Sequence, residues 1–426
     1  MKDIENSKKE APMLGLTGMG GGAASLMWAG AGETLFNLFT WGNGSEGGLG
    51  QGSTTQRSSP VQVSSGTAGS WTKIFTGSGY NKRSNAAARE EGTLWTWGAA
   101  NRGMLGHNQP GDSPSDLSSP KQVGTDTNWA FVGIGKETCI AIKTDGTLWN
   151  WGHYQYTAKV PGVPAPQQKD RSSPMQVGSG TDWRYESTDG GPPLANASNF
   201  NMAIKQNGSL WVWGVASPGS GVFGALGLND TSSEPNQRAS RSSPHQIGTD
   251  TNWAYLGDNG RVTSTAMKTD GSCWVWGRNN SGELGLNDTN DRSSPTQLSG
   301  TQWKKISVDT DGSYGVKTNG TLWSWGNNYA GNLGHNNRTY YSSPKQIPGT
   351  NWNDVEGGGQ GDTVIASKTD GTVWVCGYNP SGQLGLNNTV RISSPTQIPG
   401  FVNGRTDSFY GNFGCCQDSF AILSAQ

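Results

Sequence analysis

Few side chains in this sequence have the type and spacing that catalysis requires. There is no Gly-x-Ser-x-Gly nucleophile elbow, no His-Glu-x-x-His metal motif and no phosphate-binding Gly-x4-Gly-Lys-Ser/Thr loop. His107 and His335 each follow a Leu-Gly pair, where two equivalent positions hold Leu286 and Leu386, which indicates a structural loop position. We therefore expect no catalytic residue, no metal site and no cofactor. The sequence holds four histidines: His107, His153, His245 and His335.

The cysteines do not form a recognisable site either. Their number is odd and they lack the short paired spacings of a zinc centre. The first three occupy positions where other copies of a repeat have different residues, which favours a role as small apolar side chains. An intermolecular bridge at the adjacent last pair is the alternative. The five are Cys139, Cys273, Cys376, Cys415 and Cys416.

Three irregular loops are better candidates for function, as binding segments. Residues 99–117, 152–170 and 214–240 depart from a pattern that the rest of the chain repeats, and they do so at the same point of the repeat. Residues 184–199 depart from it at a second point. Variable loops on a rigid scaffold often carry binding function, although surface loops also drift without consequence. The side chains predicted to contact a partner are Tyr154, Tyr156, Arg184, Tyr185 and Phe223.

The repeat itself indicates the elements that hold these loops. A strand ending in Trp-Gly recurs along the chain, and a Ser-Ser-Pro-x-Gln segment follows each copy. The seventh copy has Cys-Gly in place of Trp-Gly. Repeats of roughly fifty residues are typical of propeller blades, which bury their aromatic faces against one another. The residues predicted to have this structural role are Trp41, Trp97, Trp151, Trp213, Trp276, Trp325 and Cys376.

Each copy reads as four short strands, and its clearest part is a hairpin. In Lys143–Gly152 an apolar strand leads to Asp145-Gly146, and Leu148-Trp149-Asn150-Trp151 follows. We expect Asp-Gly to form a two-residue type I′ turn here. Because alternate residues of a strand share a face, Trp149 and Trp151 lie on the same side of the sheet.

The two ends of the chain complement each other. The first copy begins at its Trp-Gly strand, Leu38-Phe39-Thr40-Trp41, without the apolar strand that precedes it elsewhere. The last copy ends with that apolar strand, Ser419-Phe420-Ala421-Ile422-Leu423. We therefore predict an all-β, seven-bladed propeller with four-stranded blades, closed by pairing of the N- and C-terminal strands, which removes exposed sheet edges.

Charge and composition narrow the class of partner. The 426 residues carry a net charge of −1, which argues against nucleic-acid binding. Residues 1–34 form a Gly- and Met-rich lead, flexible or docking, before the propeller at 35–426. The lead shows neither a signal peptide nor a transmembrane span, so we expect no membrane insertion and a chain that is soluble, cytoplasmic during synthesis, or part of a virion. Trp28 is its one predicted docking residue.

The repeat resembles that of the regulator of chromosome condensation family. The resemblance rests on the LWxWGxNxxGxLGxN run, which stands here at Leu322–Asn336 and again around Trp276–Asn287 and Val375–Asn387. It implies a seven-bladed propeller that binds proteins through its loops. Members include an exchange factor for a small GTPase that docks on chromatin, and secreted inhibitors of β-lactamase. This chain lacks a basic N-terminal arm and a wedge that matches the exchange factor.

The resemblance leaves several functions open. The Gly-Met-rich lead is similar to the starts of marine phage virion and tail-fibre proteins, and the main expectation is a non-enzymatic virion or tail-associated component. Its partner would be another virion component or a host-surface receptor. A cellular regulator, acting on a small GTPase or as an inhibitor, is the first alternative, and a glycan-binding lectin is the second.

Overall fold

The computed structural model describes most of the second of two compact units, Met1–Thr34 and Leu35–Gln426. The predicted docking residue Trp28 therefore lies outside the described residues. The described residues are 36–64, 70–76, 84–109, 115–153, 170–187, 191–197, 200–215, 224–229, 240–257, 260, 262–309, 312–358, 362–402, 413–416 and 419–424.

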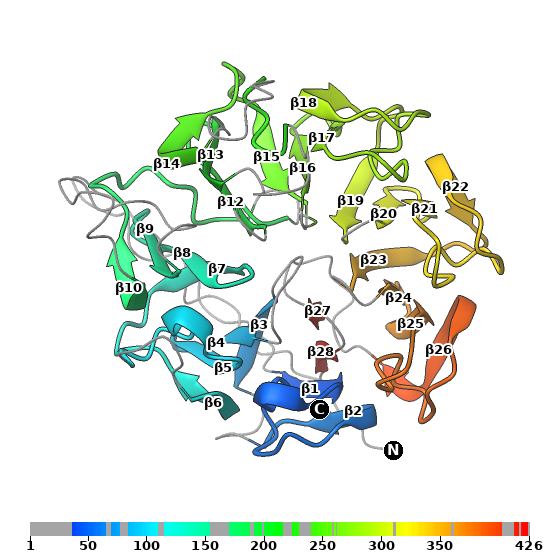
Figure 1. Cartoon of the computed structure of the whole chain (residues 1–426), viewed down its shortest axis with the longest axis horizontal. Helices are drawn as coiled ribbons and strands as arrows, with labels where there is room; N and C mark the ends of the chain where they lie inside the picture. The colour runs from blue at the N-terminus through cyan, green and yellow to red at the C-terminus, as the bar shows by residue number, and fades with distance from the viewer. Residues whose placement is uncertain are drawn as a thin grey trace, which may run out of the picture. The chain divides into compact units, whose positions relative to one another are not determined.

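These residues form seven antiparallel sheets of four strands, here called blades 1 to 7 (Figure 1). Each of blades 2 to 7 uses four consecutive strands, with the first of them toward the centre of the ring. The predicted fold, an all-β seven-bladed propeller, is confirmed. Two short 3-10 turns, η1 (Ser45–Gly47) and η2 (Asn101–Gly103), lie in loops.

The strand bounds follow the repeat. Blade 1 contains β1 (Asn37–Gly42), β2 (Arg57–Gln62), β27 (Phe413–Cys416) and β28 (Ser419–Ser424). Blade 2 contains β3 (Trp71–Thr76), β4 (Ser84–Arg89), β5 (Leu94–Gly98) and β6 (Leu117–Gln122). Blade 3 contains β7 (Trp129–Ile134), β8 (Thr138–Lys143), β9 (Leu148–Gly152) and β10 (Arg171–Gln176). Blade 4 contains β11 (Leu194–Asn196), β12 (Phe200–Ile204), β13 (Leu210–Val215) and β14 (Ser240–Gln246).

The last three blades are the most regular. Blade 5 contains β15 (Trp253–Leu256), β16 (Thr263–Lys268), β17 (Cys273–Gly277) and β18 (Arg292–Gln297). Blade 6 contains β19 (Trp303–Val308), β20 (Gly312–Lys317), β21 (Leu322–Gly326) and β22 (Tyr341–Ile347). Blade 7 contains β23 (Trp352–Gly357), β24 (Thr363–Lys368), β25 (Thr372–Gly377) and β26 (Ile392–Val402).

The ring closes through blade 1, as the chain ends predict. Strand β1 pairs with β28 in antiparallel register from Asn37 opposite Ser424 to Gly42 opposite Ser419. The indole of Trp41 stacks on the ring of Phe420, with centroids 5.8 Å apart. The two ends of the chain therefore complete one blade and leave no open sheet edge there.

The hairpin turn differs from the sequence prediction. The amide of Gly146 donates to the carbonyl of Lys143 at 2.9 Å, and that of Lys143 donates to the carbonyl of Thr147 at 3.1 Å. Gly146 has φ 76°, whereas Asp145 has a negative φ. The loop is thus a type I turn followed by a left-handed glycine, and the predicted two-residue type I′ turn was wrong.

The turn also fixes the first tryptophan of the next strand. The side-chain hydroxyl of Thr147 donates to Asp145 at 2.6 Å and accepts from the indole Nε1 of Trp149 at 2.7 Å. The same chain of hydrogen bonds recurs in the other five turns of this kind. In each, a Thr or Ser hydroxyl donates to the Asp, Asn or Glu side chain two residues earlier and accepts from the indole N–H of the Trp two residues later. Repetition of this polar pattern explains why the turn tolerates Asn in place of Asp.

A cation lies between two tryptophans in each of blades 2 to 7. In blade 3 the Lys143 ammonium lies 4.6 Å from the ring centroid of Trp129 and 3.9 Å from that of Trp149. Equivalent sandwiches form around Arg89, Lys205, Lys268, Lys317 and Lys368. Cation–π contacts contribute about 0.5–2 kcal/mol each. In blades 2, 3 and 5 to 7 these residues tie the first strand to the central hairpin, whereas in blade 4 Trp183 precedes β11 and forms an isolated bridge with Lys205.

The second tryptophan of each Trp-Gly strand packs between blades. All six such indoles are 0% exposed, and Cys376 at the seventh position is 1% exposed. The Nε1 of Trp325 donates to the carbonyl of Glu283 in the preceding blade at 2.9 Å. A Cβ on Gly285 would lie 2.8 Å from this Nε1, so the Leu-Gly loop needs glycine to approach the indole. The repeat motif is thus an interblade joint.

Candidate interaction surface

Two sets of loops lie at the same end of the blades. Because successive strands alternate in direction, the connection from first to second strand and the connection from third to fourth strand share one face. We call it the long-loop face. All three irregular loops follow a third strand, β5, β9 or β13, so they belong to this face. The hairpin turns, such as that at Asp145, lie on the opposite turn face.

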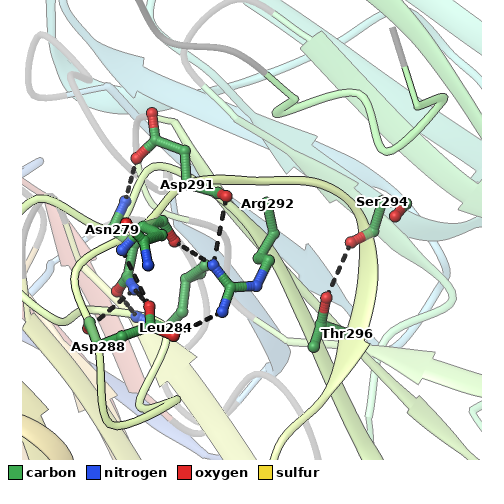
Figure 2. Close-up of polar contacts among 8 residues, drawn as sticks. Asn279, Leu284, Asp288, Asp291, Arg292, Ser294 and Thr296 are labelled. Atoms are coloured by element: carbon green, nitrogen blue, oxygen red, sulfur yellow. Dashed lines mark hydrogen bonds and ion pairs between the residues drawn. The ribbon is translucent and has the colours of Figure 1, made fainter. Parts of the chain in front are cut away.

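The regular form of the third loop is closed by its own hydrogen bonds. In blade 5 the side-chain amide of Asn279 donates to the backbone carbonyl of Asp288 at 3.0 Å, and its oxygen accepts from the amide of Leu284 at 2.9 Å (Figure 2). The Arg292 guanidinium donates to the Asp288 carboxylate at 2.6 Å. The Asp291 carboxylate accepts from the backbone amide of Asn279 at 2.8 Å. Asn328 and Asn379 make the same backbone contacts in blades 6 and 7.

The loop of blade 2 lacks this asparagine. Ala100 takes its place, and only the backbone amide is capped, by Asp116 at 3.0 Å. A small pocket lies in the loop and is lined by His107, Gln109, Ser115 and Leu117 among others. Burial lowers the pKa of His107 to about 4. The hydroxyl of Thr96 donates to the Leu105 carbonyl at 2.7 Å and lies 2.9 Å from His107 Nε2.

The loop of blade 3 begins and ends in a cluster of charges. His153 Nδ1 lies 3.5 Å from the Glu137 carboxylate, and its Nε2 lies 3.8 Å from that of Asp170. Arg102 of blade 2 reaches Asp170 at 3.2 Å. Burial lowers the pKa of His153, and the carboxylates of Asp170 and Glu137 oppose this shift. This cluster anchors the two ends of the irregular loop and joins it to the preceding blade.

Most of the predicted partner-contacting residues lie outside the described residues. Tyr154 and Tyr156 fall in 154–169, and Phe223 falls in 216–223. Their role stays a prediction. Within the described part of the chain, no group of three or more His, Cys, Asp or Glu side chains is arranged to hold a metal ion.

Arg184 and Tyr185 are both described, and both face the body of the ring. Arg184 Nη1 donates to the backbone carbonyls of Trp253 at 3.0 Å and Ala254 at 2.7 Å, in the first strand of blade 5. Tyr185 is half-buried and packs against the core that includes Trp183. The guanidinium of Arg184 therefore has a structural role between blades 4 and 5, which the sequence did not suggest.

Sequence reasoning also missed an irregular interblade joint. The indole N–H of Trp213 is buried, yet it has no hydrogen-bond partner among the described residues. In the other joints this N–H donates to the Leu-Gly loop of the preceding blade, but the loop of blade 3 has lost that motif. Loss of Leu-Gly in 152–170 was the signal that could have predicted it.

Comparison with protein families now places the repeat. Residues 37–81, 270–308, 319–361 and 370–413 match the Regulator of chromosome condensation (RCC1) repeat. The fold is thus an RCC1-like β-propeller, and four segments of the chain are similar to the RCC1 repeat. Blades 5 to 7 account for three of the four matched segments, and these are the blades in which the loop asparagine is present.

Solved RCC1-repeat propellers share the fold at low sequence identity. Yeast RCC1 (Prp20) bound to Kap60 superimposes with a TM-score of 0.74 and 17% identity, over 92% of this chain and 89% of that one. Human WBSCR16 superimposes with a TM-score of 0.73 and 17% identity, over 92% of this chain and 100% of that one. These likenesses concern the fold.

The curated relatives are longer than the region they share with this propeller. Human E3 ubiquitin-protein ligase HERC2 is 26% identical over 282 residues, which are 65% of this chain and 5% of HERC2. The Arabidopsis thaliana ultraviolet-B receptor UVR8 is 24% identical over 363 residues, which are 84% of this chain and 65% of UVR8. The ligase activity named for HERC2 is therefore not carried over to this chain.

The relatives support one expected function and not another. None of the relatives named above is a virion protein, so the expected virion or tail role has no support from them. The regulator alternative fits these relatives better. No helix in the described residues is long and apolar enough to cross a membrane.

Proposed function

We propose that this propeller is a non-enzymatic cellular regulator that binds a partner protein through its long-loop face. One observation carries the proposal. Blades 2, 3 and 4 are consecutive in the ring, and all three replace the regular third loop with an irregular one on the same face. Irregular third loops in neighbouring blades of one face are typical of a binding region on a rigid scaffold.

The described contacts hold residues at the ends of the irregular loops of blades 2 and 3. The ion pair between Arg102 and Asp170 joins the loops of blades 2 and 3. Asp116 caps the first turn of the blade 2 loop at Ala100. Pre-organised loops lose less conformational entropy when a partner binds, which increases affinity.

The regulator relatives favour a protein as the partner. One solved structure is that of Kap60 bound to yeast RCC1 (Prp20), and another is that of Prp20p from Saccharomyces cerevisiae, which binds Gsp1p and histones. By analogy, the partner proposed here is a protein, and not a virion component, a nucleic acid or a glycan. The chain's net charge of −1 is in keeping with a protein partner.

Site-specific photo-crosslinking tests the proposal. A photoreactive amino acid is placed at Gln109, which is exposed on the long-loop face, or at Thr144, which is exposed on the turn face. The full chain is irradiated in extract of its source organism, and crosslinked proteins are identified by mass spectrometry. We expect a defined partner from Gln109 and none of it from Thr144. Equal labelling from both positions would refute the assignment of the face.

A further inference from the structure

The third loops of blades 6 and 7 differ in charge from those of the other blades. Residues 327–353 and 371–406 contain neither Asp nor Glu. The residue just before the outermost strand is Asp116, Asp170 or Asp291 in blades 2, 3 and 5. In blades 6 and 7 the same position holds Tyr340 and Arg391. An acidic cap has thus been replaced by an aromatic and a cationic side chain.

The Arg391 side chain contacts aromatic rings of both blades. The Arg391 guanidinium lies 5.7 Å from the ring centroid of Tyr329 in blade 6 and 4.9 Å from that of Tyr378 in blade 7. No ion pair of Arg391 is found among the described residues, and no acidic residue lies in its loop. The positive charge is therefore held in place by two rings and is not neutralised by a carboxylate.

Large apolar side chains of the same two loops face solvent. Tyr329 is 62% exposed, Val390 is 64% exposed and Tyr340 is 48% exposed. Among the described residues only one other large apolar side chain, Met175, is exposed. We call Tyr329, Tyr340, Tyr378, Val390 and Arg391 the blade 6–7 patch.

The two loops that carry the patch are joined to each other. The amide of Asn336 in blade 6 donates to the carbonyl of Ser393 in blade 7 at 2.7 Å. A Cβ on Gly331 would lie 2.6 Å from the Cβ of Ser393, so the loop packs directly on the neighbouring strand. The patch is consequently a fixed surface whose rings do not need to be ordered on binding.

We propose that the blade 6–7 patch docks an acidic segment of the partner protein. A guanidinium held between rings can pair bidentately with a carboxylate, while Tyr329 and Val390 cover apolar parts of the segment. Tyr and Arg are the residues that most often dominate the free energy of protein–protein binding. The inference rests on the proposed function and adds a second contact region on the same face, with the charge of its ligand.

The charges favour an acidic peptide over nucleic acid. The cations in the two loops and the strands that follow them are Arg338, Lys345 and Arg391. Lys345 already donates to the Tyr341 hydroxyl at 2.8 Å. Nucleic-acid binding at physiological salt generally needs more phosphate contacts than these side chains can make.

Peptide-array binding tests the proposal. The purified full chain is applied to an array of random twelve-residue peptides, and the bound peptides are then measured in solution by fluorescence anisotropy. We expect the bound peptides to be rich in Asp and Glu. We expect Arg391→Glu to weaken their binding at least tenfold, because it reverses the charge of the patch, and Tyr329→Ala to weaken it severalfold, because that ring is exposed.

A matched variant controls for net charge. Lys121 of blade 2 occupies the repeat position of Lys345, and Lys121→Glu makes the same charge change far from the patch. It should leave peptide binding unchanged. The proposal is overturned if the bound peptides are not acidic, if Arg391→Glu binds them as the unchanged chain does, or if a uridine 12-mer binds more tightly through Arg391. Partner crosslinks from Gln109 that persist alongside any of these results would retain the proposed function and remove only the patch.

Discussion

The indole Nε1 of Trp151 donates to the backbone carbonyl of Met104 at 2.7 Å, across the boundary between blades 3 and 2. The indole of Trp213 occupies the equivalent place one blade later and is equally buried, but its N–H has no hydrogen-bond partner in the described part of the chain. The difference arises in the loop between them, because 152–170 lacks the Leu-Gly turn that supplies the carbonyl elsewhere. The irregular loop thus has a measurable cost at the joint it borders.

This pair predicts unequal effects of the same substitution. Trp151→Phe and Trp213→Phe remove the same atoms from fully buried positions, but only the first breaks a hydrogen bond. We expect Trp151→Phe to lower the free energy of unfolding by about 1 kcal/mol more than Trp213→Phe does. Urea unfolding followed by tryptophan fluorescence measures both. Equal losses would show that the hydrogen bond does not distinguish the two joints.

Substitution of Arg184 should affect stability more than partner binding. Its Nη1 donates to the two carbonyls of β15, and hydrogen bonds from charged groups contribute about 1.5–3 kcal/mol. We therefore expect Arg184→Ala to lower the free energy of unfolding by about that amount, with Arg184→Lys intermediate. Crosslinking from Gln109 by the folded variant should continue. A variant of unchanged stability that has lost its partner would instead support the contact role predicted from the sequence.

How much of this could be predicted from the sequence depends on the range of the interaction. Trp-Gly strands and Ser-Ser-Pro segments repeat, so the blade count and the closing of the ring by β1 and β28 followed from spacing alone. Arg184 does not repeat, and its acceptors lie 69 and 70 residues away as backbone carbonyls, which no side-chain pattern reveals. The hairpin type was mistaken because Asp145-Gly146 was taken as the whole loop, whereas Thr144 belongs to it as well.

The candidate site was predicted less completely for the same reason. Irregular loops were recognisable by their departure from the repeat, so the face that carries them was predictable. The charges that fix the blade 3 loop come from three separate segments, at Glu137, His153 and Asp170, and only the fold brings them together. The blade 6–7 patch was also missed. Its signal was visible in the repeats, because Tyr340 and Arg391 stand at a position where three other copies have Asp.

Two half-buried histidines, His107 and His335, predict that the protein loses stability in mild acid. Burial lowers the pKa of His107 and of His335 to about 4, from an ordinary 6.5. The unfolded chain therefore binds more protons between these values, so the free energy of unfolding decreases as the pH falls from about 6.5 to about 4. Thermal unfolding across this range measures the decrease. The double variant His107→Gln/His335→Gln should show a shallower pH dependence, and an unchanged slope would contradict the assignment.

Removal of the last strand should open the ring. Deletion of residues 415–426 removes β28, whose six residue pairs with β1 complete blade 1. We expect the truncated chain to lose its cooperative thermal transition or to aggregate, because the deletion also removes Cys415 and Cys416 of β27 and exposes the edge of β1. Deletion of 1–34 is the matched control, since the described strands begin at Asn37. A truncated chain that keeps the full melting temperature would contradict closure through blade 1.

The most direct test of the protein-binding face exchanges one irregular loop for a regular one. Residues 153–170 are replaced by the blade 5 segment 278–291, which restores the Leu-Gly turn beside Trp213. We predict that the chimera melts no lower than the parent, because the Trp213 N–H gains its carbonyl, and that the yield of partner crosslinked from Gln109 falls at least tenfold. A chimera that folds and still captures the partner at the parental yield would contradict the account.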